Sequence, residues 1–281
     1  MRQASNQDGA EMAQSGITGD EQSATGNRTS DPEPHGLIVN ADDWGRTAET
    51  TDRILDCLHC GALTSTSGMV FMEDSERAAR IACENKVDVG LHLNLTTRFS
   101  DPNVSSALLQ SQQRVARFLR SGRLAQVLYH PGLARTFRHL VDAQIEEHRR
   151  LYGSVPKRID GHHHMHLCAN VLFGRLLPEG SIVRRNFSFQ PGEKSGLNRM
   201  YRKWLDKRIE KHHPVTDYFF SIEPIGKTER LRKIVDLAKT SLVELETHPV
   251  NLEEFRFLTG GEFFRSIGPV KIASFYEVSN R

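Results

Sequence analysis

The chain has 281 residues, and its 37 Lys and Arg residues nearly balance its 35 Asp and Glu residues, giving a net charge of +2 at pH 7. This balance gives no reason to expect a nucleic acid or a membrane surface as the main partner, and no apolar run is long enough to span a bilayer. The length is sufficient for one large domain with a full core, such as an α/β barrel.

The first 35 residues are rich in Ser, Gln, Asn, Gly and Thr and contain almost no large apolar side chains. Such a segment cannot bury enough surface to offset the entropy lost on ordering. We therefore expect a disordered polar tail over residues 1–35 and a single domain over residues 36–281. The tail also lacks the apolar core of a secretory signal, so the cytoplasm is the expected compartment.

Apolar runs that are typical of buried strands alternate with amphipathic segments along the rest of the chain. This alternation predicts an α/β fold with a parallel sheet, either open or closed into a barrel. Strands are predicted at residues 37–41, 62–70, 87–96, 155–160, 181–184, 218–221, 241–249 and 270–272. Helices are predicted at residues 47–60, 73–85, 133–152, 167–177, 194–213 and 228–239, with one more near the C-terminus.

Three segments have their own interpretation. Cys57 and Cys60 form a CxxC on a predicted helix, with no second pair, so core packing is favoured over a redox or zinc site. Residues 97–130 break the strand and helix rhythm, and so long a connection is typical of a lid or a binding loop. The basic segment 194–213 is interpreted as an amphipathic surface helix with a solvated face, in preference to a nucleic-acid patch.

Two carboxylates, Asp42 and Asp43, directly follow the first buried strand. Adjacent carboxylates repel each other and raise one pKa unless a cation lies beside them. One Asp has an ordinary role as an N-cap of the following helix, but two in succession indicate a site. The third predicted strand adds His92 and Asn94 on one face; a lone His there is more often a core residue.

Four imidazoles lie within five positions at the turn after the predicted strand 155–160, in the order Asp160-Gly-His162-His163-His164-Met-His166. Imidazole is the commonest metal-binding side chain in proteins. The run is internal, unlike an expression tag, and apolar segments on both sides make a solvated loop a poorer explanation. Since neighbouring side chains of an extended turn point apart, at most two of these His residues can face one ion.

The last of the polar strand ends carries Glu246 and His248, two residues apart on one face. In a parallel α/β fold the carboxyl ends of the strands meet at one edge or mouth, so the four polar clusters are expected to converge there. A carboxylate with two imidazoles from different strands makes a metal site with open positions for water and substrate. A second carboxylate and a further His can then move protons. This combination indicates metal-assisted hydrolysis of an amide or ester.

Four stretches of the chain, in this order, resemble the motifs of the YdjC-like carbohydrate deacetylases, also called the chitooligosaccharide deacetylase or hopanoid-associated deacetylase-like family. They are residues 37–45 (LIVNADDWG), 89–96 (VGLHLNLT), 159–166 (IDGHHHMH) and 246–249 (ETHP). The resemblance covers about residues 36–275. It implies a distorted (β/α) barrel as the catalytic domain, a divalent metal ion, described for the family as magnesium, and removal of acetyl groups from N-acetylated sugars.

Carried over by position, the resemblance implies roles for individual residues. Asp42 becomes the base and His248 the acid or a substrate-orienting group, while the metal ligands are Asp43, His92 and His162. Zinc also suits such a ligand set.

The expected partner is a small carbohydrate, with no nucleic acid and no membrane, and a homodimer is left open. Two alternatives remain: a hydrolase of an ester or phosphoester on the same scaffold, and a catalytically silent sugar-binding relative. The expected substrate or second-shell contacts are Asn94, Asp160, His163, His164 and Glu246.

Overall fold

The computed structural model describes residues 35–188 and 196–279. The predicted disordered tail falls outside these ranges except for its last residue, and so do residues 194 and 195 of the predicted basic helix. Residues 33–281 form one compact unit. Among the helices in the described ranges, none combines the length and apolar character needed to cross a bilayer.

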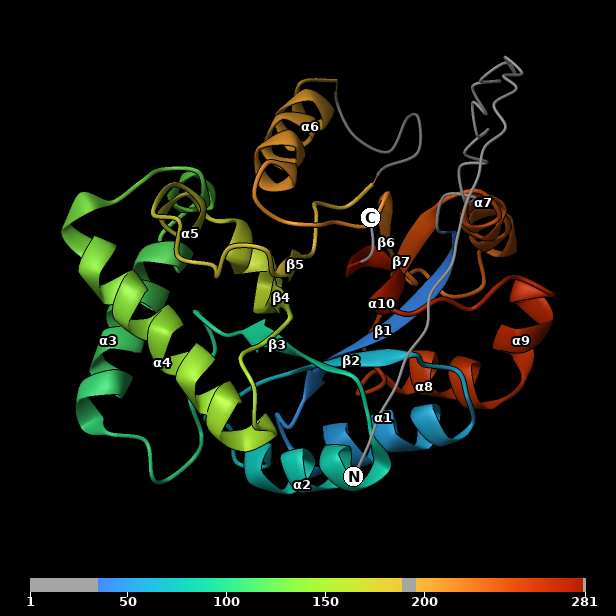
Figure 1. Cartoon of the computed structure of the whole chain (residues 1–281), viewed down its shortest axis with the longest axis horizontal. Helices are drawn as coiled ribbons and strands as arrows, with labels where there is room; N and C mark the ends of the chain where they lie inside the picture. The colour runs from blue at the N-terminus through green and yellow to red at the C-terminus, as the bar shows by residue number, and fades with distance from the viewer. Residues whose placement is uncertain (1–34, 189–195, 280–281) are drawn as a thin grey trace, which may run out of the picture. The chain divides into compact units, whose positions relative to one another are not determined.

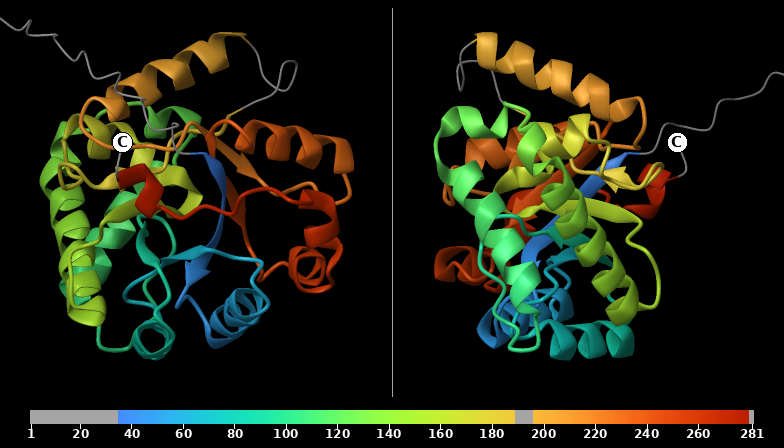
Figure 2. Two further views of the ribbon diagram at one scale, coloured as in Figure 1. Left: turned by 45° about the vertical axis from the view of Figure 1, so that its right-hand side comes forward. Right: turned by 90° about the vertical axis from the view of Figure 1, so that its left-hand side faces the viewer.

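The predicted α/β fold with parallel strands is confirmed. Seven strands form one curled sheet in the order β5-β4-β3-β2-β1-β7-β6, and every neighbouring pair is parallel. Helices surround this sheet on the outside (Figures 1 and 2). The strands are β1 (Gly36–Trp44), β2 (Ser65–Gly68), β3 (Val89–Leu93), β4 (Arg158–Gly161), β5 (Ile182–Val183), β6 (Tyr218–Ser221) and β7 (Leu242–Thr247).

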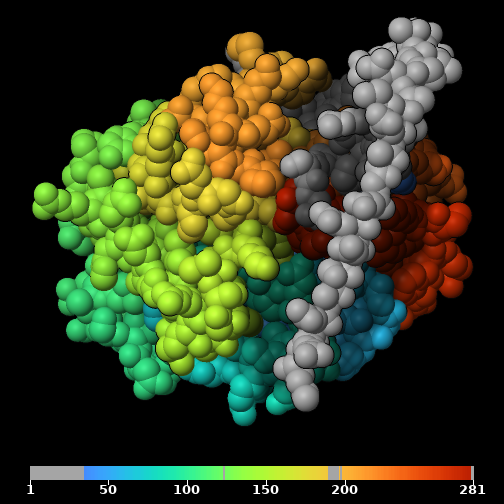
Figure 3. Space-filling model, viewed as in Figure 1, coloured from blue at the N-terminus to red at the C-terminus, as the bar shows by residue number. Residues whose placement is uncertain are grey.

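Five of the predicted helices are present within a few residues of their predicted bounds, the predicted helix 167–177 is shortened to Ala169–Phe173, and α3 was not predicted. In the space-filling view, α6 lies on the surface near the segment that contains α5 (Figure 3). The helices are α1 (Ala48–His59), α2 (Ser75–Asn85), α3 (Ser106–Arg120), α4 (Ala134–Tyr152), α5 (Ala169–Phe173), α6 (Gly196–Glu210), α7 (Thr228–Ala238), α8 (Leu252–Thr259), α9 (Glu262–Ile267) and α10 (Tyr276–Ser279).

The two edges of the sheet approach each other and nearly close the barrel. The amide of Val183 donates to the carbonyl of Pro214 at 3.1 Å, and that of Ser188 donates to the carbonyl of Phe219 at 2.7 Å. In both bonds the two residues are 31 positions apart in the sequence, and parallel segments that run side by side keep such a separation constant. The sheet is therefore a distorted barrel, whose interior is shared by all seven strands.

The predicted strand at residues 270–272 is reduced to a single bridge between Leu37 and Ile272. The side of β1 that this segment approaches is taken by β2 from Asn40 onward, so only the beginning of β1 remains available for pairing. The segment instead closes the amino-terminal end of the barrel, where Phe275 packs under the guanidinium of Arg158, 4.1 Å from the ring centre.

Residues 97–130 contain helix α3, whose Leu108, Val115 and Leu119 are buried in the same core cluster as Phe137 and Leu140 of α4. Most of this segment therefore contributes to packing, and its use as a lid stays a prediction. For the CxxC pair, core packing was expected of both cysteines, and the structure confirms it for one of them. Cys57 is buried as predicted, but Cys60 is exposed because α1 has ended there.

Candidate metal centre and active site

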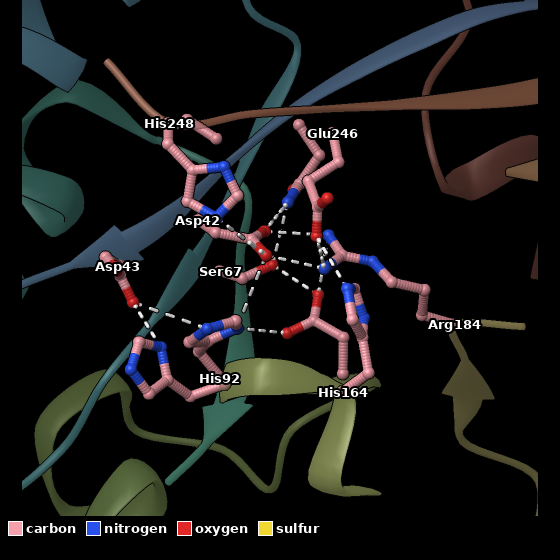
Figure 4. A network of polar contacts seen from close by, with 12 residues as sticks. Asp42, Asp43, Ser67, His92, His164, Arg184, Glu246 and His248 are labelled. Atoms are coloured by element: carbon pink, nitrogen blue, oxygen red, sulfur yellow. Dashed lines mark hydrogen bonds and ion pairs between the residues drawn. The ribbon is translucent and has the colours of Figure 1, made fainter. Parts of the chain in front are cut away.

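The carboxyl ends of four strands bring the polar clusters together at one mouth of the barrel. Asp42 and Asp43 come from β1, His92 from β3, Asp160 from β4 and Glu246 from β7. Figure 4 shows Asp43 and His92 on one side of the network, Arg184 and Glu246 on the other, and Asp42 between them.

Asp43, His92 and His162 form a compact cluster. Oδ1 of Asp43 lies 3.0 Å from Nδ1 of His162 and 3.4 Å from Nε2 of His92. The three ligand atoms lie within 4.8 Å of one another, and all three residues are buried. Asp43 has a φ of 72°, which is uncommon outside glycine, and it coincides with a register shift between Ala41 and Trp44. This irregularity places two consecutive carboxylates in different surroundings.

The cluster suits a divalent metal ion because several of its buried polar atoms have no hydrogen-bond partner. Oδ1 of Asp43 and Nε2 of both His92 and His162 are buried without a hydrogen-bond partner. Buried polar atoms are nearly always paired, and a cation held by Asp43 Oδ1, His92 Nε2 and one ring nitrogen of His162 would supply the missing partner of the carboxylate and of His92. Asp43, His92 and His162 are thus the residues that can hold a metal.

The electrostatics of the cluster also favour a cation. Burial alone would lower the pKa of His92, but the carboxylates of Asp42, Asp160 and Asp43 raise it to about 10. Burial would raise the pKa of Asp43, but the imidazoles of His162 and His92 beside its carboxylate hold it well below its usual range. The pKa of His162 is lowered, mainly by burial, which leaves its imidazole neutral. An ionised Asp43 and a neutral His162 are in the state that a divalent ion requires, and His92 would release its proton when the ion binds.

Asp160 orients His92. Its Oδ1 lies 2.7 Å from Nδ1 of the imidazole, so Nε2 faces Asp43. The other oxygen, Oδ2, accepts a hydrogen bond from Ser67 Oγ and lies 3.1 Å from a guanidinium nitrogen of Arg184. A carboxylate behind a metal-binding His fixes its tautomer and ring orientation. Asp160 therefore acts behind the metal ligands, and Ser67 is a member of the network that sequence reasoning did not identify.

Arg184 is the main residue that sequence reasoning missed. Its Nη1 and Nη2 donate to the two oxygens of Asp42 at 2.6 and 2.8 Å. Its Nε donates to Glu244 at 2.7 Å, and Nη1 also donates to Glu246 at 3.2 Å. The one signal in the sequence was a charged residue at the end of the predicted strand 181–184, at the same sheet edge as the other clusters.

Arg184 resolves the repulsion expected between the adjacent carboxylates. Burial would raise the pKa of Asp42, but the charge of Arg184, assisted by His92, holds it well below its usual range. Asp43 has separate partners: Arg46 Nη1 donates to its Oδ2 at 2.8 Å, and the imidazole of His92 lies beside its Oδ1. Each carboxylate therefore has its own cationic partner and faces different neighbours, so the two can take different chemical roles.

His248 and Glu246 lie on the other side of Asp42. Nε2 of His248 is 4.0 Å from Oδ2 of Asp42, and its side chain is 36% exposed. Its backbone amide donates to Oε2 of Glu254 at 2.6 Å, which holds the end of β7 against α8. The pKa of Glu246 is raised well above its usual value, first by burial and then by the charge of Asp42. The pair thus comprises a partly exposed imidazole and a buried carboxyl group whose pKa is raised.

The four imidazoles of the His run are separated by backbone geometry that the sequence pattern did not predict. The expected extended turn is a 3-10 segment, His162–Leu167, in which His163 and His164 have φ of 55° and 57°. His163 is exposed and its Nδ1 lies 3.0 Å from the hydroxyl of Thr96. His164 faces Glu246 at 3.7 Å, and His166 is buried, with Nε2 2.9 Å from the carbonyl of Arg184.

Asn94 has a different position from the other predicted site residues. Its side-chain amide donates to the carbonyl of Thr97 at 2.7 Å, and its Oδ1 accepts from the amides of Thr96 and Thr97. Its Nδ2 also donates to Sδ of Met72 at 3.7 Å, so its side-chain hydrogen bonds go to the loop after β3 and to Met72. Asn94 therefore supports the loop that presents Thr96 to His163 and is not directed at the metal cluster.

Comparison with known proteins supports this organisation. A carbohydrate deacetylase from Clostridium beijerinckii is 27% identical over 77% of this chain and 82% of its own length. A chitooligosaccharide deacetylase from Proteus mirabilis is 32% identical over 47% of this chain and 51% of its own length. A candidate cellobiose-phosphate cleavage protein from Enterococcus faecalis, of known structure, shares the fold with a TM-score of 0.60 at 20% identity, covering 82% of this chain and 93% of its own. Residues 36–264 match the model of one family, and the chain therefore belongs to the YdjC-like protein family.

Proposed function

We propose that this protein is a metal-dependent hydrolase that removes acetyl groups from N-acetylated sugars. The observation that carries the proposal is the buried Asp43–His92–His162 cluster, with its unpartnered ligand atoms, beside a carboxylate that Arg184 holds separately. Relatives named carbohydrate deacetylase and chitooligosaccharide deacetylase support the choice of an acetylated sugar over other amides.

Asp43, His92 and His162 would hold the metal ion. When bound, a divalent ion polarises the acetyl carbonyl and lowers the pKa of water. We keep magnesium as the expected ion from the family, although two imidazoles with one carboxylate also suit zinc.

Asp42 is the proposed base. Its low pKa keeps the carboxylate ionised at neutral pH, and the two bonds from Arg184 fix the plane of the carboxylate. In the reaction, the water oxygen bonds to the acetyl carbon while Asp42 accepts a proton from that water. The carbon–nitrogen bond then breaks, and acetate and a sugar amine are released.

His248 is the proposed acid for the departing amine. Its Nε2 lies 4.0 Å from Oδ2 of Asp42, and about a third of its side chain is exposed, so a sugar can reach it. His163 and His164 border the same mouth and are proposed to contact the sugar, with Glu246 behind His164. The cytoplasm is still the expected compartment, and the question of a homodimer is left open.

A substrate panel tests the proposal. Acetate release from N-acetylglucosamine oligomers is compared with hydrolysis of an aryl acetate ester and an aryl phosphate, all with added divalent metal. We expect acetate from the oligomers, lost in Asp42→Asn and kept in Asp52→Asn, an exposed control on α1. Phosphate release without acetate would replace the proposal with the phosphoesterase alternative. Sugar binding without any hydrolysis would favour the silent relative.

A further inference from the structure

An unusual concentration of exposed apolar side chains lies away from the active site. Of the 14 large hydrophobic residues that are exposed in the described ranges, eight fall in three short segments. Four lie between residues 124 and 129, one is Phe173 at the end of α5, and three are on α6. The last three are Met200, Tyr201 and Trp204, with exposed fractions of 65%, 39% and 51%.

Contacts between these segments join them into one region. The rings of Phe173 and Trp204 are 6.3 Å apart, and Tyr201 stacks beside Trp204 at 6.2 Å. The segment before α4 is tied to α5 by a reciprocal pair, in which His130 N donates to Asn170 Oδ1 and Asn170 Nδ2 donates to His130 O. We call Phe173, Met200, Tyr201 and Trp204 the α6 patch. Such an exposed apolar patch marks an interaction surface.

The α6 patch is surrounded by positive charge. Arg199, Lys203 and Lys207 follow one another at four-residue spacing on α6 and are exposed, and the guanidinium of Arg208 lies 4.6 Å from the centre of the Phe173 ring. Of the two carboxylates of α6, Asp206 is buried against Arg185 and Asn186, so it does not neutralise the exposed face. The near-zero net charge of the whole chain conceals this local excess.

We propose that the α6 patch binds the surface of an anionic lipid membrane, as a peripheral contact and independently of the deacetylase reaction. Trp and Tyr prefer the boundary between headgroups and acyl chains, and cations at the same level attract anionic headgroups. The binding is peripheral because no helix in the described part of the chain can span a bilayer. This proposal departs from the sequence-based expectation of no membrane partner. That expectation was based on the net charge of the whole chain and not on the charge around the α6 patch.

Two other occupants fit the surface less well. A second copy related by two-fold symmetry would place the same cations opposite one another, because such an interface pairs one patch with itself. A nucleic acid would use the aromatic rings and cations. However, Met200, with 65% exposure the most exposed member of the patch, is an aliphatic side chain that neither stacks on bases nor forms hydrogen bonds with them. An anionic lipid surface satisfies both the aliphatic and the cationic groups.

Intrinsic fluorescence offers a direct test, since the chain has two Trp residues and Trp44 is fully buried. The full-length protein is mixed with vesicles of phosphatidylcholine alone or with phosphatidylglycerol added. With the anionic vesicles we expect co-sedimentation and a blue shift of Trp204 emission, both reversed by high salt. The double variant Lys203→Glu, Lys207→Glu should lower binding about tenfold or more. The matched double variant Lys233→Glu, Lys239→Glu, with one exposed lysine on α7 and one directly after it, should bind as the wild type.

Several results would overturn the proposal. These are absence of binding to anionic vesicles at low salt, equal binding to neutral vesicles, or equal loss in both double variants when circular dichroism shows that all three proteins are folded. Self-association or RNA binding through Trp204, without vesicle binding, would assign the surface to one of the other occupants. Acetate release is not part of this test, so its result is independent of the proposed function.

Discussion

Replacing Arg184 by Met should destabilise the protein strongly, because one guanidinium compensates several buried carboxylates. Arg184 is buried and contacts Asp42, Asp160, Glu244 and Glu246 at 2.6 to 3.2 Å. Removing one partner of a buried ion pair leaves an uncompensated charge and costs about 3–5 kcal/mol. For a domain of this size, each kcal/mol lowers Tm by about 2–4 °C, so the expected loss is about 6–20 °C.

The pH dependence separates lost charge compensation from lost packing. Without Arg184, the carboxyl groups around it have higher pKa values in the folded state than in the wild type. A group with a raised folded pKa contributes stability at low pH that is lost as pH rises. The deficit of the variant should therefore be largest near pH 7.5 and smaller near pH 5.

The assay is denaturant and thermal unfolding of metal-free protein at both pH values, with Arg138→Met as the control. Arg138 is an exposed residue of α4 that donates to the backbone carbonyl of Gly174 at 3.2 Å, so its loss should depend little on pH. A variant Arg184→Met within about 1 kcal/mol of the wild type, or equally destabilised at both pH values, would refute the compensation argument.

Two further predictions concern residues away from the metal cluster. Burial lowers the pKa of His148 to about 4, so the folded protein resists protonation of this residue and loses stability as pH falls from about 6.5 towards 4. In urea unfolding, His148→Gln should remove about 2 kcal/mol of the stability loss between pH 7 and pH 5. An unchanged loss in the variant would contradict this. A Cβ at position 90 would lie 2.7 Å from Cζ of Arg158, whose guanidinium is held in place by Asn40 and Ser67. Gly90→Ala should therefore cost about 1–3 kcal/mol, measured by calorimetry, and a neutral effect would show that Arg158 moves freely.

The fold and the metal cluster could be predicted from the sequence because both depend on local patterns and one general rule. Apolar runs identified the strands, and parallel strands carry polar residues at one edge. That rule predicted that the polar strand ends meet at one mouth, and the resemblance to the YdjC-like motifs then selected Asp43, His92 and His162 as the ligands. The structure adds the distances and the unpartnered atoms that make the cluster suitable for a metal.

Arg184 could not be predicted because its importance comes from partners that no local pattern connects. It is 142 residues from Asp42 and reaches it across the barrel interior. Its place at the end of the predicted strand 181–184 was the one signal, and the neighbouring Arg185 carries the same charge. The separation of the His run has a similar cause, since the left-handed conformations of His163 and His164 are rare for residues other than glycine. Asn94 shows the converse, because its hydrogen bonds to the following loop could not be seen from strand periodicity.

Metal content and acetate release, measured together in Asp42→Asn and Asp43→Asn, test the central claim most directly. The roles assigned here predict that Asp42→Asn keeps bound metal but loses acetate release from N-acetylglucosamine oligomers, whereas Asp43→Asn loses both. In the wild type, chelation should abolish acetate release and one added divalent metal should restore it. Full acetate release by chelated wild-type protein, or by Asp43→Asn without metal, would contradict the account.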